Sequence, residues 1–215
     1  IKAMTLLRMA GLEYVEDRTG FRRAPKGKLP FIDDNGEIVA DSTLIRLHIE
    51  KTRNMDFDAH LTDVQKDIAW SMQTMCEEHL YWAIVSARWQ SDANFARGPG
   101  KIFDGAPAPF RPLIKWLVRR KVIASLKAQG FGRYNCAEAI VLTSRDIESL
   151  ATFIGDKQFL FGLTPCAADA TVFAFLAATL SPINEWPIRD LALSKPNLVA
   201  YRDRMMQRYF PDFLS

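Results

Sequence analysis

The sequence predicts an α+β protein of two domains, in which a part with helices and strands precedes an all-helical part. Two short β-prone segments flank a turn at residues 33–36, and helix-like segments lie on either side of them within residues 1–53. Residues 54–61 are polar and have no periodicity, which is typical of a linker. Over residues 62–215, apolar side chains recur at helical spacing. We therefore expect domains at 1–53 and 62–215.

The first ten residues, Ile1 to Ala10, have the apolar spacing of a helix, and Gly11 follows in a position typical of a helix C-terminus. Tyr14-Val15-Glu16 is a short strand candidate before the polar, turn-rich stretch 18–28. No capping residue precedes the opening helix. We therefore expect the natural chain to extend upstream of Ile1.

A β-hairpin is the clearest strand signal. Leu29–Ile32 and Glu37–Ala40 flank the pair Asn35-Gly36, which supplies the positive φ angles that a tight turn needs. Asp41-Ser42 can cap the helix that follows over 43–51, which has one apolar side. The expected order is thus helix, three strands, helix.

The rest of the chain reads as helices. Thr62 opens a long helix that reaches about Trp89. Residues 98–109 are rich in glycine and proline, which predicts a loop or lid. Further helices are expected at 112–129, 137–155, 166–180 and 197–209, with a break at 130–132.

Composition and charge exclude several classes of protein. Of 215 residues, 48% are apolar and 25% are charged, as in an ordinary globular chain. The net charge of +3 is too small for a dedicated nucleic-acid binder, so no nucleic-acid partner is expected. The three cysteines lack disulfide-framework and metal-ligand spacing, which favours a reducing, cytoplasmic location. The longest apolar run, Val172–Ala178, is too short for a transmembrane segment.

Two patterns in the first part could bind a ligand. Pro30 belongs at a strand start, and a cis peptide bond there would turn the Leu29 backbone outward; a plain strand-entry proline is the alternative. At Asp41-Ser42, free helix amides, the positive end of the helix dipole and a hydroxyl group could receive a carboxylate, while Asp41 could accept from an ammonium group. The alternative is an ordinary helix cap.

Other candidates lie in the helical part. Cys166 and Asp169 have the spacing of a structural capping box. Tyr81, Trp82 and Arg88 could line a pocket in which Arg88 stabilises negative charge, or could be an aromatic core stripe with a solvated arginine.

Histidines and basic residues give weaker signals. His48, His60 and His79 lack partners at ligand spacing, so no metal is expected. The run 119–121 is basic and predicts a solvated helix face, although Trp116 beside it leaves contact with an acidic membrane surface open.

In this order, and with an all-helical second half, the chain resembles the glutathione transferase superfamily, most closely the metaxin-like branch that includes the failed-axon-connections proteins. The resemblance spans nearly the whole chain. It rests on AlaProLysGlyLysLeuProPhe (24–31), AlaAspSer (40–42), TyrTrpAlaIleValSerAlaArgTrp (81–89), ArgArgLysVal (119–122), PheLeuPheGly (159–162), AlaAspAlaThrValPhe (168–173) and ProAsnLeuValAlaTyr (196–201).

The resemblance implies a thioredoxin-like N-terminal domain, here without its first strand, and an all-α C-terminal domain. It implies that glutathione is a co-substrate, with the Leu29 backbone on its cysteinyl part, Pro30 as the cis-proline, and Asp41 and Ser42 on the γ-glutamyl end. The hydroxyl or thiol residue that activates glutathione is expected upstream of Ile1, so the catalytic residue is unknown.

The implied function is a glutathione transferase that conjugates or otherwise transfers the glutathione thiolate to a small hydrophobic electrophile, and that works as a homodimer. Two alternatives stay open. One is a non-catalytic, metaxin-like scaffold or membrane-associated adaptor. The other is a glutathione-dependent thiol reductase or peroxidase that uses a cysteine upstream.

Overall fold

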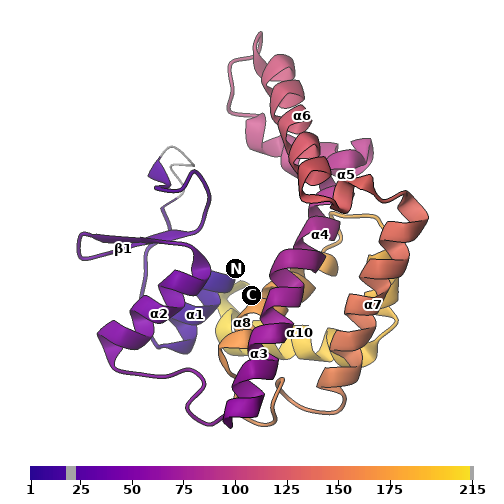
Figure 1. The fold of residues 1–215 in the computed structure, drawn as a ribbon. Helices are drawn as coiled ribbons and strands as arrows, with labels where there is room; N and C mark the ends of the chain where they lie inside the picture. The colour runs from indigo at the N-terminus through magenta and orange to yellow at the C-terminus, as the bar shows by residue number, and fades with distance from the viewer. Residues whose placement is uncertain (18–22, 214–215) are drawn as a thin grey trace.

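The described residues of the first part form helices α1 and α2 and a hairpin (Figure 1). A computed structural model describes residues 1–17 and 23–213, so the turn-rich stretch expected at 18–28 lies partly outside the described residues. The elements of this part are α1 (Lys2–Met9), β1 (Phe31–Asp34), β2 (Glu37–Ala40) and α2 (Ser42–Arg53). Gly11 ends α1 as predicted, with a φ of +68°.

The predicted hairpin is present. β1 and β2 pair antiparallel with Phe31 opposite Ala40. The turn residues Asn35 and Gly36 have φ angles of +55° and +95°, the values that the Asn-Gly pair predicts. β1 begins at Phe31 and not at Leu29, because Pro30 has no N–H group to donate to a ladder.

The strand predicted at Tyr14–Glu16 is wrong. Residues 12–17 have no regular structure, and Val15 is 96% exposed. The Tyr14 hydroxyl instead accepts a hydrogen bond from Arg8 Nε at 3.1 Å. In the described residues the sheet consists of β1 and β2, so no neighbouring strand satisfies the backbone of this segment.

The long helix predicted from Thr62 is continuous, but a π-helical turn interrupts its α-helical hydrogen bonding. It consists of α3 (Asp63–Met75), a π-helical turn (Cys76–Leu80) and α4 (Tyr81–Gln90). Thr62 caps it as expected, with its hydroxyl accepting from the Gln65 N–H.

Later helices agree with the predictions to within one residue at each end. They are α6 (Arg111–Gln129), α7 (Cys136–Ile154), α8 (Ala167–Thr179) and α10 (Pro196–Tyr209). The predicted loop at 98–109 contains a 3₁₀ turn at Pro99–Phe103. Two helices were not predicted, because they are too short to show a helical period: α5 (Asp92–Arg97) and α9 (Pro187–Leu193).

Arg119 does not lie on a solvated face, which corrects the prediction for this residue. Its guanidinium group donates to the carbonyl oxygens of Trp89 and Gln90, both at 2.8 Å. These carbonyl groups belong to the C-terminal end of α4, where helix carbonyls lack partners within the helix and a cation is favourable.

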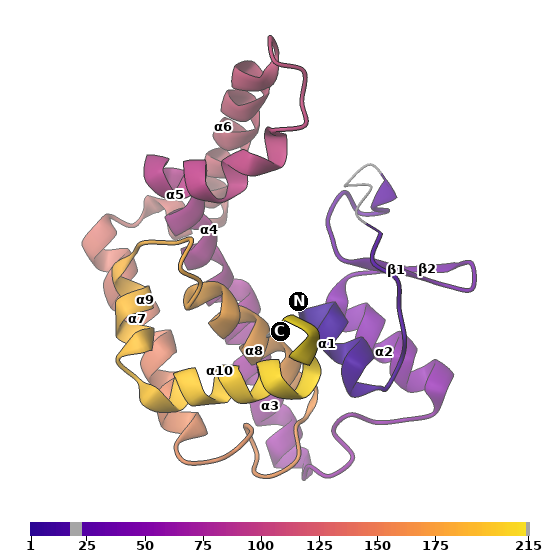
Figure 2. The ribbon, with the colours of Figure 1, turned by 180° about the vertical axis from the view of Figure 1, so that it is seen from behind.

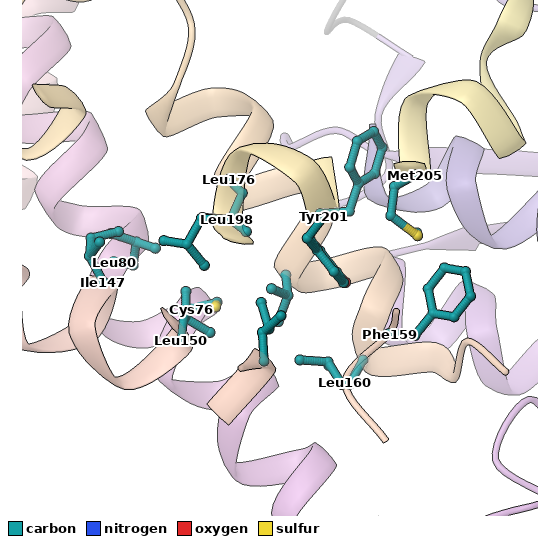
Figure 3. Close-up of a cluster of buried hydrophobic side chains, with 14 of the residues drawn as sticks. Cys76, Leu80, Ile147, Leu150, Phe159, Leu160, Leu176, Leu198, Tyr201 and Met205 are labelled. Atoms are coloured by element: carbon teal, nitrogen blue, oxygen red, sulfur yellow. The ribbon is translucent and has the colours of Figure 1, made fainter. Parts of the chain in front are cut away.

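The main core surrounds α8, which is apolar on nearly all sides. α8 packs against α3, α10 and the π-helical turn. Figure 3 shows buried side chains of this cluster from several elements: Cys76, Leu80, Ile147, Leu150, Phe159, Leu160, Leu176, Leu198, Tyr201 and Met205.

A second cluster joins the first part of the chain to the N-terminal end of α8. Leu6 of α1 and Ile45 of α2 pack with Ala167 and Ala170 of α8. Phe57, from the predicted linker, is buried in the same cluster. Figure 2 shows α1 between α8 and α2, and α1 also contacts α10. The predicted linker is therefore part of a packed interface.

Asp58 of this linker ties the two parts together by hydrogen bonds. Its Oδ1 accepts from the Ala167 N–H at 2.9 Å, and its Oδ2 accepts from the Arg46 guanidinium at 2.6 Å. The Asp58 side chain is 6% exposed. The domain boundaries at residues 53 and 62 stay a prediction, whereas the contact across them is direct.

Candidate functional site

The two segments with predicted ligand-binding residues meet at the end of the hairpin. The Asp41 N–H donates to the Pro30 carbonyl oxygen at 3.1 Å, which extends the ladder by one bond beyond β1 and β2. The Leu29–Pro30 peptide bond is cis. Hairpin register thus places Leu29 and Pro30 directly beside Asp41 and the start of α2.

Asp41 caps α2, as its position before the helix predicts. Its Oδ1 accepts from the Thr43 N–H at 2.8 Å and from the Leu44 N–H at 3.3 Å. The backbone of Asp41 has a φ of +86°, which is costly for a residue with a Cβ atom. Backbone strain of this kind tends to occur at ligand-binding sites, where the surrounding structure holds it in place.

Several polar groups at this end of α2 have no partner within residues 1–17 and 23–213. They are the Leu29 N–H, the Ser42 N–H and hydroxyl, and Asp41 Oδ2. Leu29 is 50% exposed, and Asp41 is also exposed. The site therefore offers N–H and O–H donors near the positive end of a helix dipole, with a carboxylate oxygen beside them.

A polar network that no sequence pattern indicates lies next to this site. The Thr43 hydroxyl accepts from Lys2 Nζ at 3.3 Å and from Gln73 Nε2 at 3.1 Å. Lys2 also pairs with Glu77, and its side chain is 10% exposed. Because these residues come from α1, α2, α3 and the π-helical turn, the site lies where the first part meets the helical part.

Asp34 fixes the hairpin against α2. Its carboxylate pairs with His48 Nε2 at 2.8 Å and with the Arg53 guanidinium at 2.9 Å. The His48 hydrogen bond, followed by that of Arg53, holds the pKa of Asp34 below its ordinary value of 3.8. Leu29 comes just before the hairpin, and Ser42 begins α2. The pairing of Asp34 with α2 therefore helps to hold these two parts of the site in a fixed relative position.

The candidate pocket residues of α4 do not form one group. Tyr81 is 41% exposed and meets Trp82 edge to face, with ring centroids 5.0 Å apart. Arg88 is turned toward the C-terminal end of α8, where it reaches the Ala178 carbonyl oxygen at 3.4 Å. A cavity of about 300 Å³ lies between α4, α7 and residues 185–188, and none of these three residues lines it.

Asp169 is a buried centre of hydrogen bonds. It is 0% exposed, and its carboxylate accepts from the N–H groups of Cys166 at 2.8 Å and Leu160 at 3.0 Å. The Tyr201 hydroxyl donates to the same carboxylate at 2.7 Å. The predicted capping box of Cys166 and Asp169 is therefore present, and its carboxylate reaches two further segments that the motif does not contain.

Possible metal ligands are scattered among the described residues, and two of the three cysteines are buried. Within residues 1–17 and 23–213, no three His, Cys, Asp or Glu side chains lie close enough to hold a metal ion. Burial raises the pKa of the Cys76 and Cys166 thiols, which disfavours the reactive thiolate form. No helix of the described part is both long and apolar enough to cross a bilayer.

A hairpin with a cis-proline lies beside the start of a helix, and this unit packs on a helical bundle. Proteins with the glutathione transferase fold have this arrangement. Residues 1–94 match the family of glutathione S-transferase N-terminal domains, and residues 143–205 match that of the C-terminal domains. The chain belongs to the glutathione S-transferase superfamily. Its first part is thus a thioredoxin-like domain with few strands.

The relatives include a named glutathione S-transferase on one side and failed-axon-connections and metaxin proteins on the other. The chain is 31% identical to Failed axon connections of Drosophila melanogaster, covering 99% of this chain and 54% of that protein, so it spans about half of that relative. It is 30% identical to the isoprene-epoxide glutathione S-transferase of Rhodococcus sp. strain AD45, covering 97% of this chain and 90% of that protein. It is 26% identical to the metaxin-1 homolog of Caenorhabditis briggsae, covering 88% of this chain and 61% of that protein.

Solved structures agree on the fold. A beta-etherase of Sphingobium sp. strain SYK-6 superposes with a TM-score of 0.63 at 14% identity, covering 98% of this chain and 93% of that one. A glutathione transferase of Bombyx mori gives 0.60 at 16% identity, covering 98% and 83%. At these identities the likeness concerns the architecture alone.

Proposed function

We propose that this chain binds glutathione at the start of α2 and transfers its thiolate to a small hydrophobic electrophile. The observation that carries the proposal is the hydrogen bond from the Asp41 N–H to the Pro30 carbonyl at 3.1 Å. It brings the Leu29 N–H next to the N–H and hydroxyl of Ser42, and none of these groups has a partner in the described part of the chain. Glutathione fits this combination, because it is a tripeptide whose backbone can pair with Leu29 and whose charged γ-glutamyl end can bind the groups of Ser42.

The cysteinyl and γ-glutamyl parts of glutathione each have a complementary group in the proposed complex. The Leu29 backbone pairs with the cysteinyl backbone. The Ser42 N–H and hydroxyl donate to the γ-glutamyl carboxylate, where the α2 dipole adds a favourable interaction. Asp41 Oδ2 accepts from the γ-glutamyl ammonium group, while Oδ1 keeps its capping bonds to Thr43 and Leu44.

The reaction requires a thiolate, because the free thiol has a pKa of about 8.5 and is mostly protonated at neutral pH. The sulfur forms a bond to an electrophilic carbon, whose leaving group departs or whose strained ring opens, and the thiol proton passes to solvent or to the released oxygen. In this proposal the helical part, with Tyr81 and Trp82, holds the electrophile. An epoxide is the first substrate to test, since the Rhodococcus relative is named for one.

A homodimer in the cytoplasm completes the proposal. Leu44 and Leu47 of α2 are 44% and 53% exposed, and a second copy could cover them. The three cysteines are free, which fits a reducing compartment.

Titration calorimetry with glutathione tests the binding site. Ser42→Ala and Asp41→Ala should each weaken binding by about 1–3 kcal/mol, because each leaves a polar or charged group of the ligand without a partner. Asp41→Asn separates the two roles of this residue: it keeps an oxygen for the cap but removes the charge that the ammonium group needs.

Matched controls lie on α3. Ser71→Ala removes an exposed hydroxyl that bonds the Asp67 carbonyl of its own helix, and Asp67→Ala removes an exposed carboxylate. Neither should change glutathione affinity. Unchanged affinity in folded Ser42 and Asp41 variants would reduce the pair to a helix cap. Absence of any glutathione binding by the full protein would favour a non-catalytic scaffold.

A further inference from the structure

α6 projects from the rest of the helical part (Figures 1 and 2), and the side chains on one of its faces are exposed. Leu113, Trp116 and Leu117 on this face are 55%, 53% and 51% exposed. Arg120 and Lys121 follow one turn later and are also exposed. The spacing i, i+3, i+4, i+7 and i+8 places all five on one side of the helix, and we call them the α6 face.

The charge of α6 is concentrated and unbalanced. The helix carries six Lys and Arg residues and no acidic residue, whereas the whole chain has a net charge of only +3. Arg120 lies over the Trp116 ring at 5.2 Å. Within residues 1–17 and 23–213, no carboxylate pairs with Arg120 or Lys121. Asp92 pairs with Arg119 of α6, and Asp104 pairs with Lys115. Both of these cations lie outside the α6 face.

We infer that the α6 face binds the surface of an anionic phospholipid membrane. Leu113, Trp116 and Leu117 would enter the interface between headgroups and acyl chains, and Arg120 and Lys121 would pair with the lipid headgroup anions. A tryptophan with a cation stacked on it suits this depth, because its ring is apolar at one end and polar at the other. This inference is independent of glutathione binding.

Other occupants fit the α6 face less well. A second copy of the chain would bring the same unpaired cations against each other, which is repulsive. A nucleic acid would pair with Arg120 and Lys121 but would leave two leucines without apolar contact. An anionic membrane satisfies both sets of side chains. Because no described helix is suited to cross a bilayer, α6 is expected to lie on the membrane and not to span it.

Vesicle co-sedimentation of the full protein tests the inference. Vesicles of phosphatidylserine with phosphatidylcholine should bind the protein, and vesicles of phosphatidylcholine alone should bind it much more weakly. The double variant Arg120→Gln/Lys121→Gln should bind the anionic vesicles about thirtyfold more weakly, since each cation near such a surface contributes to attraction. Trp116→Ala should also weaken binding, and added salt should weaken the wild type.

A charge-matched control separates the α6 face from net charge. Lys51→Gln/Arg145→Gln removes two exposed cations from α2 and α7 and should leave vesicle binding unchanged. Equal loss in both double variants would overturn the inference. Equal binding to the two kinds of vesicle would also overturn it.

Two further measurements identify a different occupant. If Leu117→Asp converts a dimer to a monomer by light scattering without changing vesicle binding, the α6 face belongs to a second copy. If duplex DNA binds the wild type through Arg120 and Lys121 while anionic vesicles do not, the face belongs to a nucleic acid. Either result would contradict a membrane role.

Discussion

Replacing Asp169 by alanine should remove a large part of the stability of the helical part. The carboxylate accepts hydrogen bonds from the N–H groups of Leu160 and Cys166 and from the Tyr201 hydroxyl, and it is 0% exposed. Each buried donor left without a partner costs about 1–3 kcal/mol, so three donors set a range of about 3–9 kcal/mol. Water that enters the vacated space can satisfy some donors, and burial of the carboxylate is itself unfavourable. We therefore expect a loss of about 3–5 kcal/mol in the free energy of unfolding.

Urea unfolding followed by circular dichroism measures this loss. Tyr201→Phe removes one of the three bonds and should cost about 1–1.5 kcal/mol, which stays measurable if Asp169→Ala fails to fold. Asp63→Ala is the matched control, because Asp63 lies exposed in the first turn of α3 and should contribute well under 1 kcal/mol. A loss for Asp169→Ala no larger than for Asp63→Ala would refute this reasoning, since it would show that the three donors find other partners at no cost.

Two other predictions concern the first part of the chain. Asp58→Ala should lower the free energy of unfolding by about 2 kcal/mol, because it leaves the Ala167 N–H without a partner and removes one of the two carboxylates that bind Arg46, which keeps its bond to Glu50; a thermal unfolding midpoint equal to that of the wild type would contradict this. Asp34 has a pKa below its ordinary 3.8, so its stabilising effect is complete above that pH and is lost as the pH falls through the lower, folded-state value. Asp34→Asn should therefore show a shallower loss of urea resistance than the wild type between about pH 5 and pH 2, and parallel curves would exclude a role for the His48 pair.

Local sequence patterns predicted most of the helices and strands, and they predicted the Asp41 cap at the start of α2. The Asn35-Gly36 turn, the Asp41 cap and the long helices each depend on residues close in the sequence, and their positions are confirmed. The Tyr14–Glu16 strand failed because strand propensity is not enough without a pairing neighbour.

Partnerships between distant residues could not be predicted. Asp58 and Ala167 are 109 positions apart, Lys2 and Glu77 are 75 apart, and His79 pairs with Asp146 across 67 positions. No spacing rule connects such pairs, because helix packing alone brings them together. For the same reason the sequence indicated that Ser42 could hold an anion but gave no sign of the Lys2 network beside it.

The sharing of α8 between the two clusters has a consequence for folding and evolution. One end of α8 packs with Leu6 and Ile45 of the first part, while its remaining faces form the centre of the main core. Neither part can lose its structure without uncovering apolar surface on the same helix, so the two parts are expected to unfold in a single cooperative transition. Exchange of one part between homologous proteins would accordingly succeed only when the small residues Ala167 and Ala170 are exchanged along with the helices that they touch.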